Sequence, residues 1–225
     1  MQFPPEVLVF LQNTGQRKKL AMRIQIDSNR MCRVIDPIMR GLRIQTPEFA
    51  GMKAGDRALD VCCGTGSQAF HYARMGIVAA GIDLDPRMIE VAEKNRRKQG
   101  LSNVSFQMAS ALDLPFEDDS FNYASISMSL HEKEMVDRDR IISEMKRVVK
   151  KEGAMVFIDY EVPFPRIPSS YLSKALEQIA GRNHWRCFKD YTEQGGLDGL
   201  LRKNHLHQEK RGSLGPLAII KTPNA

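Results

Sequence analysis

The feature that most constrains the fold is a regular alternation of short apolar runs and longer amphipathic runs between residues 56 and 159. The apolar runs have the length of buried strands, and the amphipathic runs have the length of helices. Strands are expected at residues 57–62, 77–82, 104–108, 121–128 and 153–159, and helices at residues 68–75, 86–99 and 138–150. Because strands that alternate with helices pair in parallel, the sequence predicts an α/β fold with a doubly wound, mostly parallel sheet.

The segments on either side of this core differ from it in character. Residues 1–50 have helical periodicity and are expected to form a helical cover over a core at residues 51–160. Prolines 163, 165 and 168 exclude a further central strand, so residues 161–203 are interpreted as a helical substrate cap. Residues 204–225 are expected to form a β-hairpin that completes the core sheet.

Inside the cap and the hairpin the sequence suggests finer boundaries. Ser169 or Ser170 is expected to cap a helix that runs through Ala180, and shorter helices are expected at residues 188–193 and 197–201. The hairpin is expected to turn at Gly212-Ser213.

Composition excludes several classes of protein. With 42% hydrophobic and 27% charged residues, the chain has the composition of a globular protein and not of a disordered one. Its longest apolar runs are far shorter than the ~20 residues of a membrane-spanning helix, and no secretory signal pattern opens it. The four cysteines lack zinc-ligand spacing, so we expect reduced thiols, a cytoplasmic location and no metal site.

The net charge of +6 is unevenly distributed along the chain. Residues 1–50 carry eight Lys and Arg against four Asp and Glu, residues 51–160 carry fifteen against seventeen, and residues 161–225 carry ten against six. Basic ends around a slightly acidic centre fit an anionic substrate, an anionic membrane surface or nucleic acid, and equally fit a solvated surface without a partner.

A glycine-rich loop follows the first expected strand. Gly64, Gly66 and Ala69 fit the G-x-G-x-x-G/A pattern, and Asp83 ends the next strand where a ribose-binding carboxylate is expected. A dinucleotide and S-adenosylmethionine both fit this pattern. Asp60 favours S-adenosylmethionine, because its carboxylate opposes a pyrophosphate and suits a donor that carries a sulfonium and an ammonium group.

Four segments together resemble the class I S-adenosylmethionine-dependent methyltransferases, in particular the ubiquinone/menaquinone biosynthesis C-methyltransferases. The segments are residues 59–66 (LDVCCGTG), 81–88 (GIDLDPRM), 109–116 (ASALDLPF) and 144–153 (EMKRVVKKEG). The resemblance covers about residues 56–159 and implies a Rossmann-like methyltransferase fold and S-adenosylmethionine as cofactor.

The resemblance also implies roles for individual residues. Cys62, Gly64 and Gly66, with Asp60 near them, would surround the methionine part of the donor, Asp83 would bind the ribose hydroxyls, and Leu84, Ser110 and Ala111 would contact the adenine. Ser127, at the end of the fourth strand, is the last predicted donor contact. The sequence departs from the family at Cys62, where glycine or alanine is frequent, and at Ser110, where aspartate is frequent.

His131 follows the fourth expected strand and is the best-placed acid/base group. An imidazole with an ordinary pKa near 6.5 is suited to remove a proton from an acceptor during methyl transfer. Two alternatives remain open: His131 orders its loop through a backbone carbonyl, or alignment of donor and acceptor supplies the rate without a strong base.

The acceptor is expected to lie under the N-terminal helices and the cap. His184, Trp185 and Tyr191 lie in a stretch that mixes aromatic rings and cations, which suits a flat or anionic acceptor and equally suits an ordinary packed cap. Gly195, Gly196 and Gly199 interrupt the following helices and fit either a hinge or a turn.

The combined prediction is S-adenosylmethionine-dependent methyl transfer to a small-molecule acceptor, amphiphilic or aromatic, with peripheral contact to an anionic membrane. Two alternatives are a nucleic-acid or protein methyltransferase and a non-catalytic S-adenosylmethionine-binding regulator. The first lacks a separate RNA-binding module and an Asn/Asp-Pro-Pro-aromatic motif, since residues 127–130 read SMSL.

Overall fold

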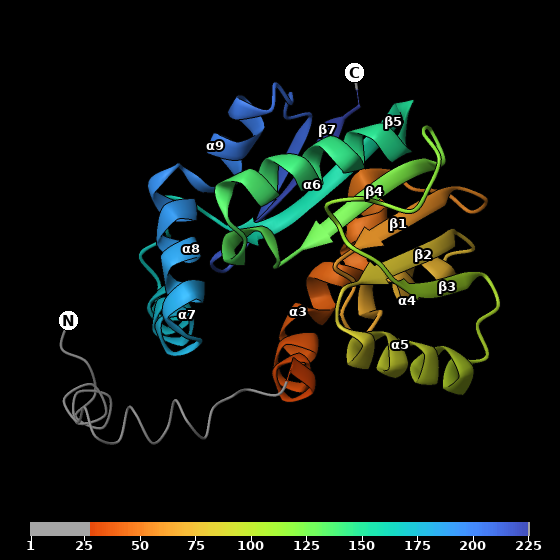
Figure 1. Cartoon of the computed structure of the whole chain (residues 1–225), viewed down its shortest axis with the longest axis horizontal. Coiled ribbons are helices and arrows are strands. Elements are labelled where there is room, and N and C mark those ends of the chain that lie inside the picture. The colour runs from red at the N-terminus through yellow and green to blue at the C-terminus, as the bar shows by residue number, and fades with distance from the viewer. Residues whose placement is uncertain (1–27, 225) are drawn as a thin grey trace.

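The fold is built on one seven-stranded sheet, seen in a computed structural model that describes residues 28–224 (Figure 1). The strand order is β3-β2-β1-β4-β5-β7-β6. In chain order the strands are β1 (Arg57–Val61), β2 (Val78–Asp83), β3 (Val104–Met108), β4 (Phe121–Ser127), β5 (Val149–Tyr160), β6 (Lys210–Leu214) and β7 (Leu217–Pro223). Strands β1 to β5 are parallel, and β7 is antiparallel to both β5 and β6. The doubly wound, mostly parallel Rossmann-like sheet expected from the sequence is confirmed.

Helices cover the sheet and its C-terminal edge. They are α3 (Ser28–Ala50), α4 (Ser67–Arg74), α5 (Pro86–Gln99), the short 3-10 helix η1 (Leu130–Glu132), α6 (Met135–Val148), α7 (Pro168–Ile179), α8 (Arg182–Glu193) and α9 (Gly196–Lys203). Helices α4 and α5 pack on β1 to β3, whereas α6 and α9 pack on β5. Helices α7 and α8 lie together beyond the ends of β4 and β5, where α8 contacts η1 (Figure 1). No helix within residues 28–224 combines the length and apolar character needed to cross a bilayer.

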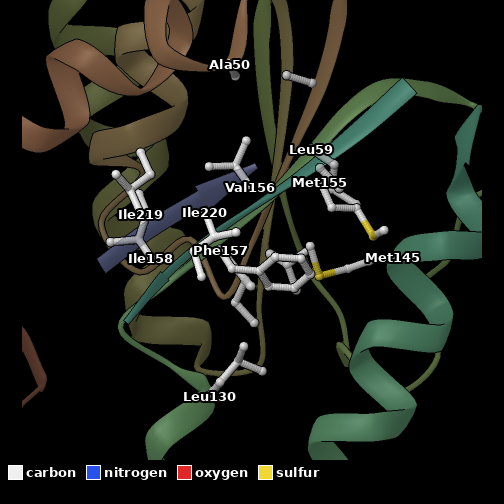
Figure 2. Close-up of a cluster of buried hydrophobic side chains, with 14 of the residues drawn as sticks. Ala50, Leu59, Leu130, Met145, Met155, Val156, Phe157, Ile158, Ile219 and Ile220 are labelled. Atoms are coloured by element: carbon white, nitrogen blue, oxygen red, sulfur yellow. The ribbon is translucent and has the colours of Figure 1, made fainter. Parts of the chain in front are cut away.

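The core is centred on β5, whose residues from Ala154 to Tyr160 are all buried. Successive side chains of a strand point to opposite faces of the sheet. Met155 and Phe157 accordingly point towards Met145 of α6, while Val156 and Ile158 point to the other side (Figure 2). Because β5 is buried on both faces and paired on both edges, its C-terminal end is a fixed point for the loops that follow.

Several expected boundaries are wrong. The hairpin turns at Gly215-Pro216 and not at Gly212-Ser213, because Leu214 pairs with Leu217 and Gly215 takes the positive φ of +59° that a tight turn needs. Neither Ser169 nor Ser170 caps α7, which begins at Pro168 after Ile167, with proline in the first turn.

Other segments begin earlier than expected. Helix α6 starts at Met135 and ends at Val148, and β5 starts directly at Val149. Helix α8 starts at Arg182, well before the expected residue 188. The helices expected within residues 1–27 lie outside the described residues, and so does the basic cluster at residues 17–23, which consists of Arg17, Lys18, Lys19 and Arg23.

A buried arginine ties the cap to the core. Arg138 of α6 is fully buried, and its guanidinium donates to the carbonyls of Leu130 in η1 (2.9 Å) and Cys187 in α8 (2.7 Å). It also pairs with Asp190 of α8 at 2.7 Å and lies 5.5 Å from the ring centre of Tyr191. One side chain therefore links α6, the loop after β4 and the cap.

Replacing Arg138 by leucine is expected to lower the free energy of unfolding by about 3–5 kcal/mol, because buried carbonyls and a carboxylate lose their partner. Urea titration of the two proteins measures this change. The matched control is Arg186→Leu in α8, which removes an exposed ion pair with Glu134 and is expected to cost less than about 1 kcal/mol. Equal effects of the two substitutions would show that Arg138 does not anchor the cap.

Candidate functional site

The predicted donor residues meet at the point where the strand order reverses. Strands β1 and β4 are neighbours, yet β1 leads on to β2 and β4 leads on to β5, in opposite directions along the sheet. Ligands of open α/β sheets bind beyond the carboxyl ends of the strands at such a switch point. Asp60, Asp83 and Ser127 lie at the C-terminal ends of β1, β2 and β4, so the fold brings all three to this edge.

The loop after β1 requires its glycines. Gly64 and Gly66 have positive φ angles of +52° and +78°, and a Cβ on Gly66 would come 2.5 Å from the ring of Phe106. The amide of Gly64 donates to Oδ2 of Asp83 at 2.9 Å, and the amide of Asp85 donates to Oδ1 at 2.9 Å. Asp83 therefore fixes the glycine loop against β2, and its carboxylate keeps acceptor capacity for ligand hydroxyls.

Asp60 is buried below this loop. Its Oδ1 accepts a hydrogen bond from the Ser125 hydroxyl at 3.2 Å. Burial raises the pKa of Asp60 to about 7, although the positive charge of Arg43 and the bond from Ser125 act in the opposite direction. A carboxyl group that titrates near neutral pH becomes fully ionised when a cationic group binds beside it.

Cys62 occupies the turn between Asp60 and the glycines. Its φ of +57° lies in the left-handed region, where the family's frequent glycine is unstrained. Burial raises the pKa of the Cys62 thiol to about 11, so the group is neutral at physiological pH. Cys62, Cys63 and Cys187 are all free thiols, as expected from the sequence.

The residues predicted to contact the adenine lie at the ends of β2 and β3. Leu84 is 71% exposed, which leaves its apolar side chain open to a flat ligand. The Ser110 hydroxyl accepts a hydrogen bond from the amide of Leu112 at 3.2 Å, and Ala111 lies between them in this turn. Ser110 keeps its hydroxyl proton for a further partner. The adenine contacts of all three residues stay predictions.

Ser127 has an unsatisfied hydroxyl. Its Oγ is buried at the end of β4, and among the described residues it has no hydrogen-bond partner. Buried hydroxyls rarely lack a partner. A polar ligand at the switch point would supply one, which supports the predicted role of Ser127 in donor binding.

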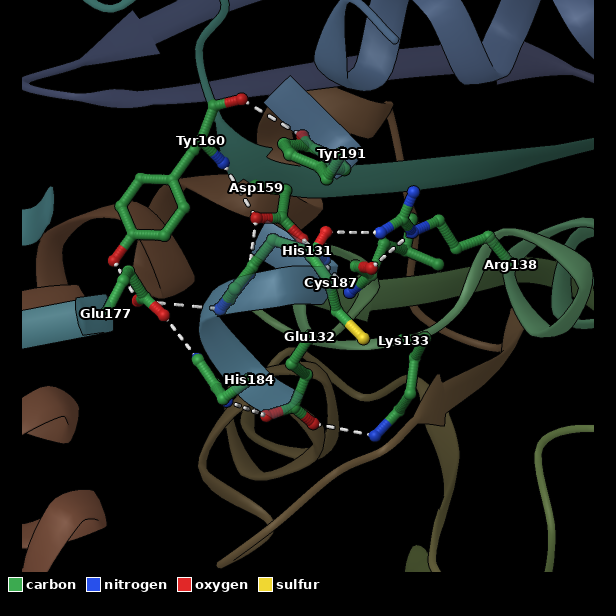
Figure 3. Close-up of polar contacts among 11 residues, drawn as sticks. His131, Glu132, Lys133, Arg138, Asp159, Tyr160, Glu177, His184, Cys187 and Tyr191 are labelled. Atoms are coloured by element: carbon green, nitrogen blue, oxygen red, sulfur yellow. Dashed lines mark hydrogen bonds and ion pairs between the residues drawn. The ribbon is translucent and has the colours of Figure 1, made fainter. Parts of the chain in front are cut away.

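His131 is buried and tightly held (Figure 3). Its Nδ1 lies 2.7 Å from Oδ1 of Asp159, and its Nε2 lies 3.6 Å from Oε1 of Glu177. Burial lowers the pKa of His131, but the charges of Asp159, Glu177 and Glu132 outweigh burial and raise it to about 9. A ring protonated at neutral pH holds no free lone pair, so the structure gives no direct support to a general base. A catalytic role for His131 stays a prediction.

The three predicted acceptor residues of the cap have different surroundings. His184 contacts Glu177 through Nε2, and its Nδ1 lies 3.6 Å from Glu132. Trp185 stacks on Phe188, with ring centres 5.4 Å apart. Tyr191 is fully buried, and its hydroxyl donates to the carbonyl of Tyr160 at 3.0 Å. Trp185 and Tyr191 thus pack within the cap, and their contact with an acceptor stays a prediction.

Three residues around His131 were not found from the sequence. Asp159 and Tyr160 end β5, and the Tyr160 hydroxyl donates to Oε1 of Glu177 at 2.7 Å. The position of Asp159 at a strand end was a usable signal, since the same argument identified Asp83. Glu177 carries no such signal, because it lies within α7 and becomes buried only when α7 packs beside η1 and α8.

Comparison with known protein families gives a match over most of the chain. A family described as "Methyltransferase domain" matches residues 52–205. Among curated proteins, the methyltransferase GfsG of Streptomyces halstedii is 37% identical over 195 residues, which cover 82% of this chain and 68% of that protein. The demethylmenaquinone methyltransferase of Bacillus subtilis is 32% identical over 157 residues, 67% of this chain. The match spans 66% of that relative's length, just under two thirds.

Solved structures show the same fold. A SAM-dependent methyltransferase from Aquifex aeolicus superposes with a TM-score of 0.66 at 18% identity, covering 89% of this chain and all of that one. The PH0226 protein from Pyrococcus horikoshii gives a TM-score of 0.65 at 20% identity, covering 88% of this chain and 93% of that one. At these identities the likeness concerns the fold alone.

The raised pKa of Asp60 predicts a pH-dependent stability. Between about pH 4 and pH 7 the unfolded chain releases this proton while the folded chain keeps it, so the stability contributed by Asp60 falls as the pH rises. The Asp60→Asn protein has no carboxyl group to ionise at this position, so it does not lose this stability as the pH rises. Its free energy of unfolding, relative to the wild type, is expected to increase by a few kcal/mol from pH 4.5 to pH 7.5 and then to level off.

Urea titrations across this pH range measure the difference. The control is Asp113→Asn, which removes an exposed carboxylate from the same molecule. If the free energies of unfolding of the wild type and of Asp60→Asn change in parallel from pH 4.5 to pH 7.5, the raised pKa of Asp60 is contradicted.

Proposed function

Because the chain belongs to the class I S-adenosylmethionine-dependent methyltransferases, we propose that it transfers the donor's methyl group to a small, flat acceptor of the quinone type. The observation that carries the donor site is the convergence of Asp60, the glycine loop and Asp83 at the switch point. The acceptor class is supported by relatives whose names specify demethylmenaquinone and 2-phytyl-1,4-naphtoquinone. The named quinone relatives do not favour a nucleic-acid or protein acceptor.

The charges and the shape of the donor indicate which residue would bind each part of it. The donor's ammonium and sulfonium groups would lie near Asp60, whose carboxylate ionises in response to them. Asp83 would accept hydrogen bonds from the ribose hydroxyls while the amide of Gly64 keeps it in place. Leu84 would cover the adenine ring. The absence of side chains at Gly64 and Gly66 lets the donor approach the backbone.

Methyl transfer is a direct displacement. A nucleophilic ring carbon of the reduced acceptor attacks the methyl carbon, the carbon–sulfur bond breaks, and the sulfonium becomes a neutral thioether. The ring carbon then releases its proton to restore aromaticity. Since the sulfonium is already activated, alignment of donor and acceptor supplies much of the rate. We place the acceptor beside residues of η1 and of the cap.

The cytoplasmic location and the peripheral membrane contact expected from the sequence belong to this proposal. The three free thiols support a reducing compartment. The basic cluster at residues 17–23 motivates the membrane contact.

Calorimetry tests the donor site. S-adenosylhomocysteine is expected to bind the wild type, and NADH is not. Asp83→Ala is expected to weaken S-adenosylhomocysteine binding by about 1.5–3 kcal/mol, or roughly 10- to 150-fold, through lost charge-assisted hydrogen bonds to the ribose. Glu152→Ala, which removes an exposed carboxylate near the start of β5, at the edge of the sheet opposite the donor site, is the control and should bind as the wild type does. An unchanged affinity in folded Asp83→Ala would reject this role.

Transfer of labelled methyl from S-adenosylmethionine tests the acceptor. A reduced naphthoquinone without a ring methyl is expected to become labelled, and total RNA is not. If His131 takes the acceptor's proton, as the sequence predicts, His131→Ala should lower turnover in this assay about 100-fold or more while the affinity for S-adenosylhomocysteine stays nearly constant. A loss of less than tenfold would leave His131 a structural residue, and labelling of RNA alone would overturn the acceptor class.

A further inference from the structure

Three side chains from three separate elements converge at the junction of core and cap. His131 comes from η1, Glu177 from α7 and His184 from α8, and one ligand atom of each lies within 4.8 Å of the others. His131 and Glu177 are buried, and His184 is partly exposed. Figure 3 shows dashed contacts from the Glu177 carboxylate to both His131 and His184. We propose that these three residues bind a divalent transition-metal ion, with Zn²⁺ as the best-suited ion.

The chemistry of the three ligands fits this class of ion. Two imidazoles and a carboxylate are the protein ligands of many zinc sites that keep one coordination position open. Ligand atoms about 2.1 Å from a tetrahedral zinc ion lie about 3.4 Å from one another. The Nε2 of His131 is 3.6 Å from Oε1 of Glu177, and His184 contacts the other carboxylate oxygen. Small side-chain shifts suffice to place an ion between them.

His131 is oriented as metal-bound histidines usually are, and a carboxylate also lies near the outer nitrogen of His184. Metal-bound histidines normally donate the other ring N–H to a carboxylate or carbonyl, which fixes the tautomer. Nδ1 of His131 lies 2.7 Å from Asp159, and Nδ1 of His184 lies 3.6 Å from Glu132. With the proton on Nδ1, the Nε2 atom of His131 presents its lone pair to the common centre. The Nε2 atom of His184 faces the same centre, where it contacts Glu177. A hydrogen-bonded carboxylate–histidine pair beside a second histidine and a carboxylate is a more specific arrangement than a single ion pair.

The charge of the surroundings also favours a cation. Three carboxylates, those of Asp159, Glu177 and Glu132, surround the two imidazoles, and Lys133 pairs with Glu132 at 2.6 Å. With neutral imidazoles this group carries two uncompensated negative charges, which a divalent ion neutralises. Burial makes such compensation necessary, because unpaired charges are costly away from water.

A coordination position left open would let the ion take part in methyl transfer. This part of the inference rests on the proposed function. An acceptor hydroxyl bound to the ion would release its proton to water more readily, and the resulting oxyanion would donate electron density to the ring or attack the methyl itself. In either case the carbon–sulfur bond of the donor breaks and a neutral thioether leaves. The site is therefore expected to favour acceptors that carry an oxygen next to the methylated position.

Metal binding is tested without donor or acceptor. The full chain, prepared without a histidine tag and stripped with a chelator, is expected to bind about one Zn²⁺ per chain and to show the absorption of four-coordinate Co²⁺ when Co²⁺ is supplied. His184→Ala and Glu177→Gln should each lower the Zn²⁺ affinity at least 100-fold in calorimetry. Glu132→Gln should lower it about 10-fold, since Glu132 only orients His184. His207→Ala, which removes an exposed imidazole outside the cluster, should bind as the wild type does.

A conservative substitution separates a metal site from an ion pair. His184→Cys should retain Zn²⁺, because a thiolate is also a zinc ligand, whereas cysteine cannot replace the contact between His184 and Glu177 as an ion pair. Zn²⁺ should also raise the melting temperature of the wild type and of His184→Cys but not of His184→Ala. These readouts do not depend on turnover, so the proposed methyl transfer can fail while the metal site stands.

Two results would overturn the proposal. One is a wild-type chain that binds no Zn²⁺ or Co²⁺ at equimolar ratio. The other is equal Zn²⁺ affinity in the wild type, His184→Ala and Glu177→Gln. In both cases the cluster is an ion-pair network that joins cap to core, and a chain that transfers methyl groups after chelation would then do so without a metal.

Discussion

The arrangement of the site depends on one buried carboxylate, that of Asp159. It stands at the end of β5, is fully buried, and accepts hydrogen bonds from the backbone amides of Leu130, His131 and Tyr160. It also holds Nδ1 of His131. Four contacts on one carboxylate compensate the cost of burying its charge. They fix the loop after β4 to the end of β5, and the orientation of His131 follows from that attachment.

The cap is joined to the core by polar contacts as well as by apolar packing. Arg138 donates to carbonyls on both sides of the junction, and Tyr160 and Glu177 bond across it. Buried polar contacts are directional, so they specify one placement of α7 and α8 over the sheet's edge. The fold therefore holds a preformed, largely buried cluster of rings and carboxylates at the junction of core and cap, and the chemistry proposed for it relies on that rigidity.

Sequence reasoning succeeded where a local pattern encodes a backbone requirement. The glycine loop and Asp83 were predicted because strand, turn and spacing are all local, and Gly64 and Asp83 prove to be hydrogen-bonded to each other. The hairpin turn was misplaced because Gly212-Ser213 and Gly215-Pro216 both resemble turns. The choice between them is made by the pairing of β7 with β5, which is a tertiary effect.

The cluster around Glu177 shows a different limit of sequence reasoning. Glu177 and His184 lie on separate helices divided by Gly181, whose φ of +132° ends one helix before the next begins. Their distance in the sequence fits no metal-ligand pattern within a single helix. His131 is distant from both in the chain and was predicted as an isolated acid/base group. Only the packing of α7 and α8 on η1 brings the three together.

The antiparallel strand β7 has a consequence for how the chain folds as it is synthesised. Strand β7 lies between β5 and β6 in the sheet, but it leaves the ribosome after every other strand that the structure describes. Until then one edge of β5 has unpaired backbone groups beside strongly apolar side chains, which is the kind of edge that invites misassociation. In the finished register Asp159 pairs with Ala218, so the position on which the site depends is secured only after β7 has emerged from the ribosome.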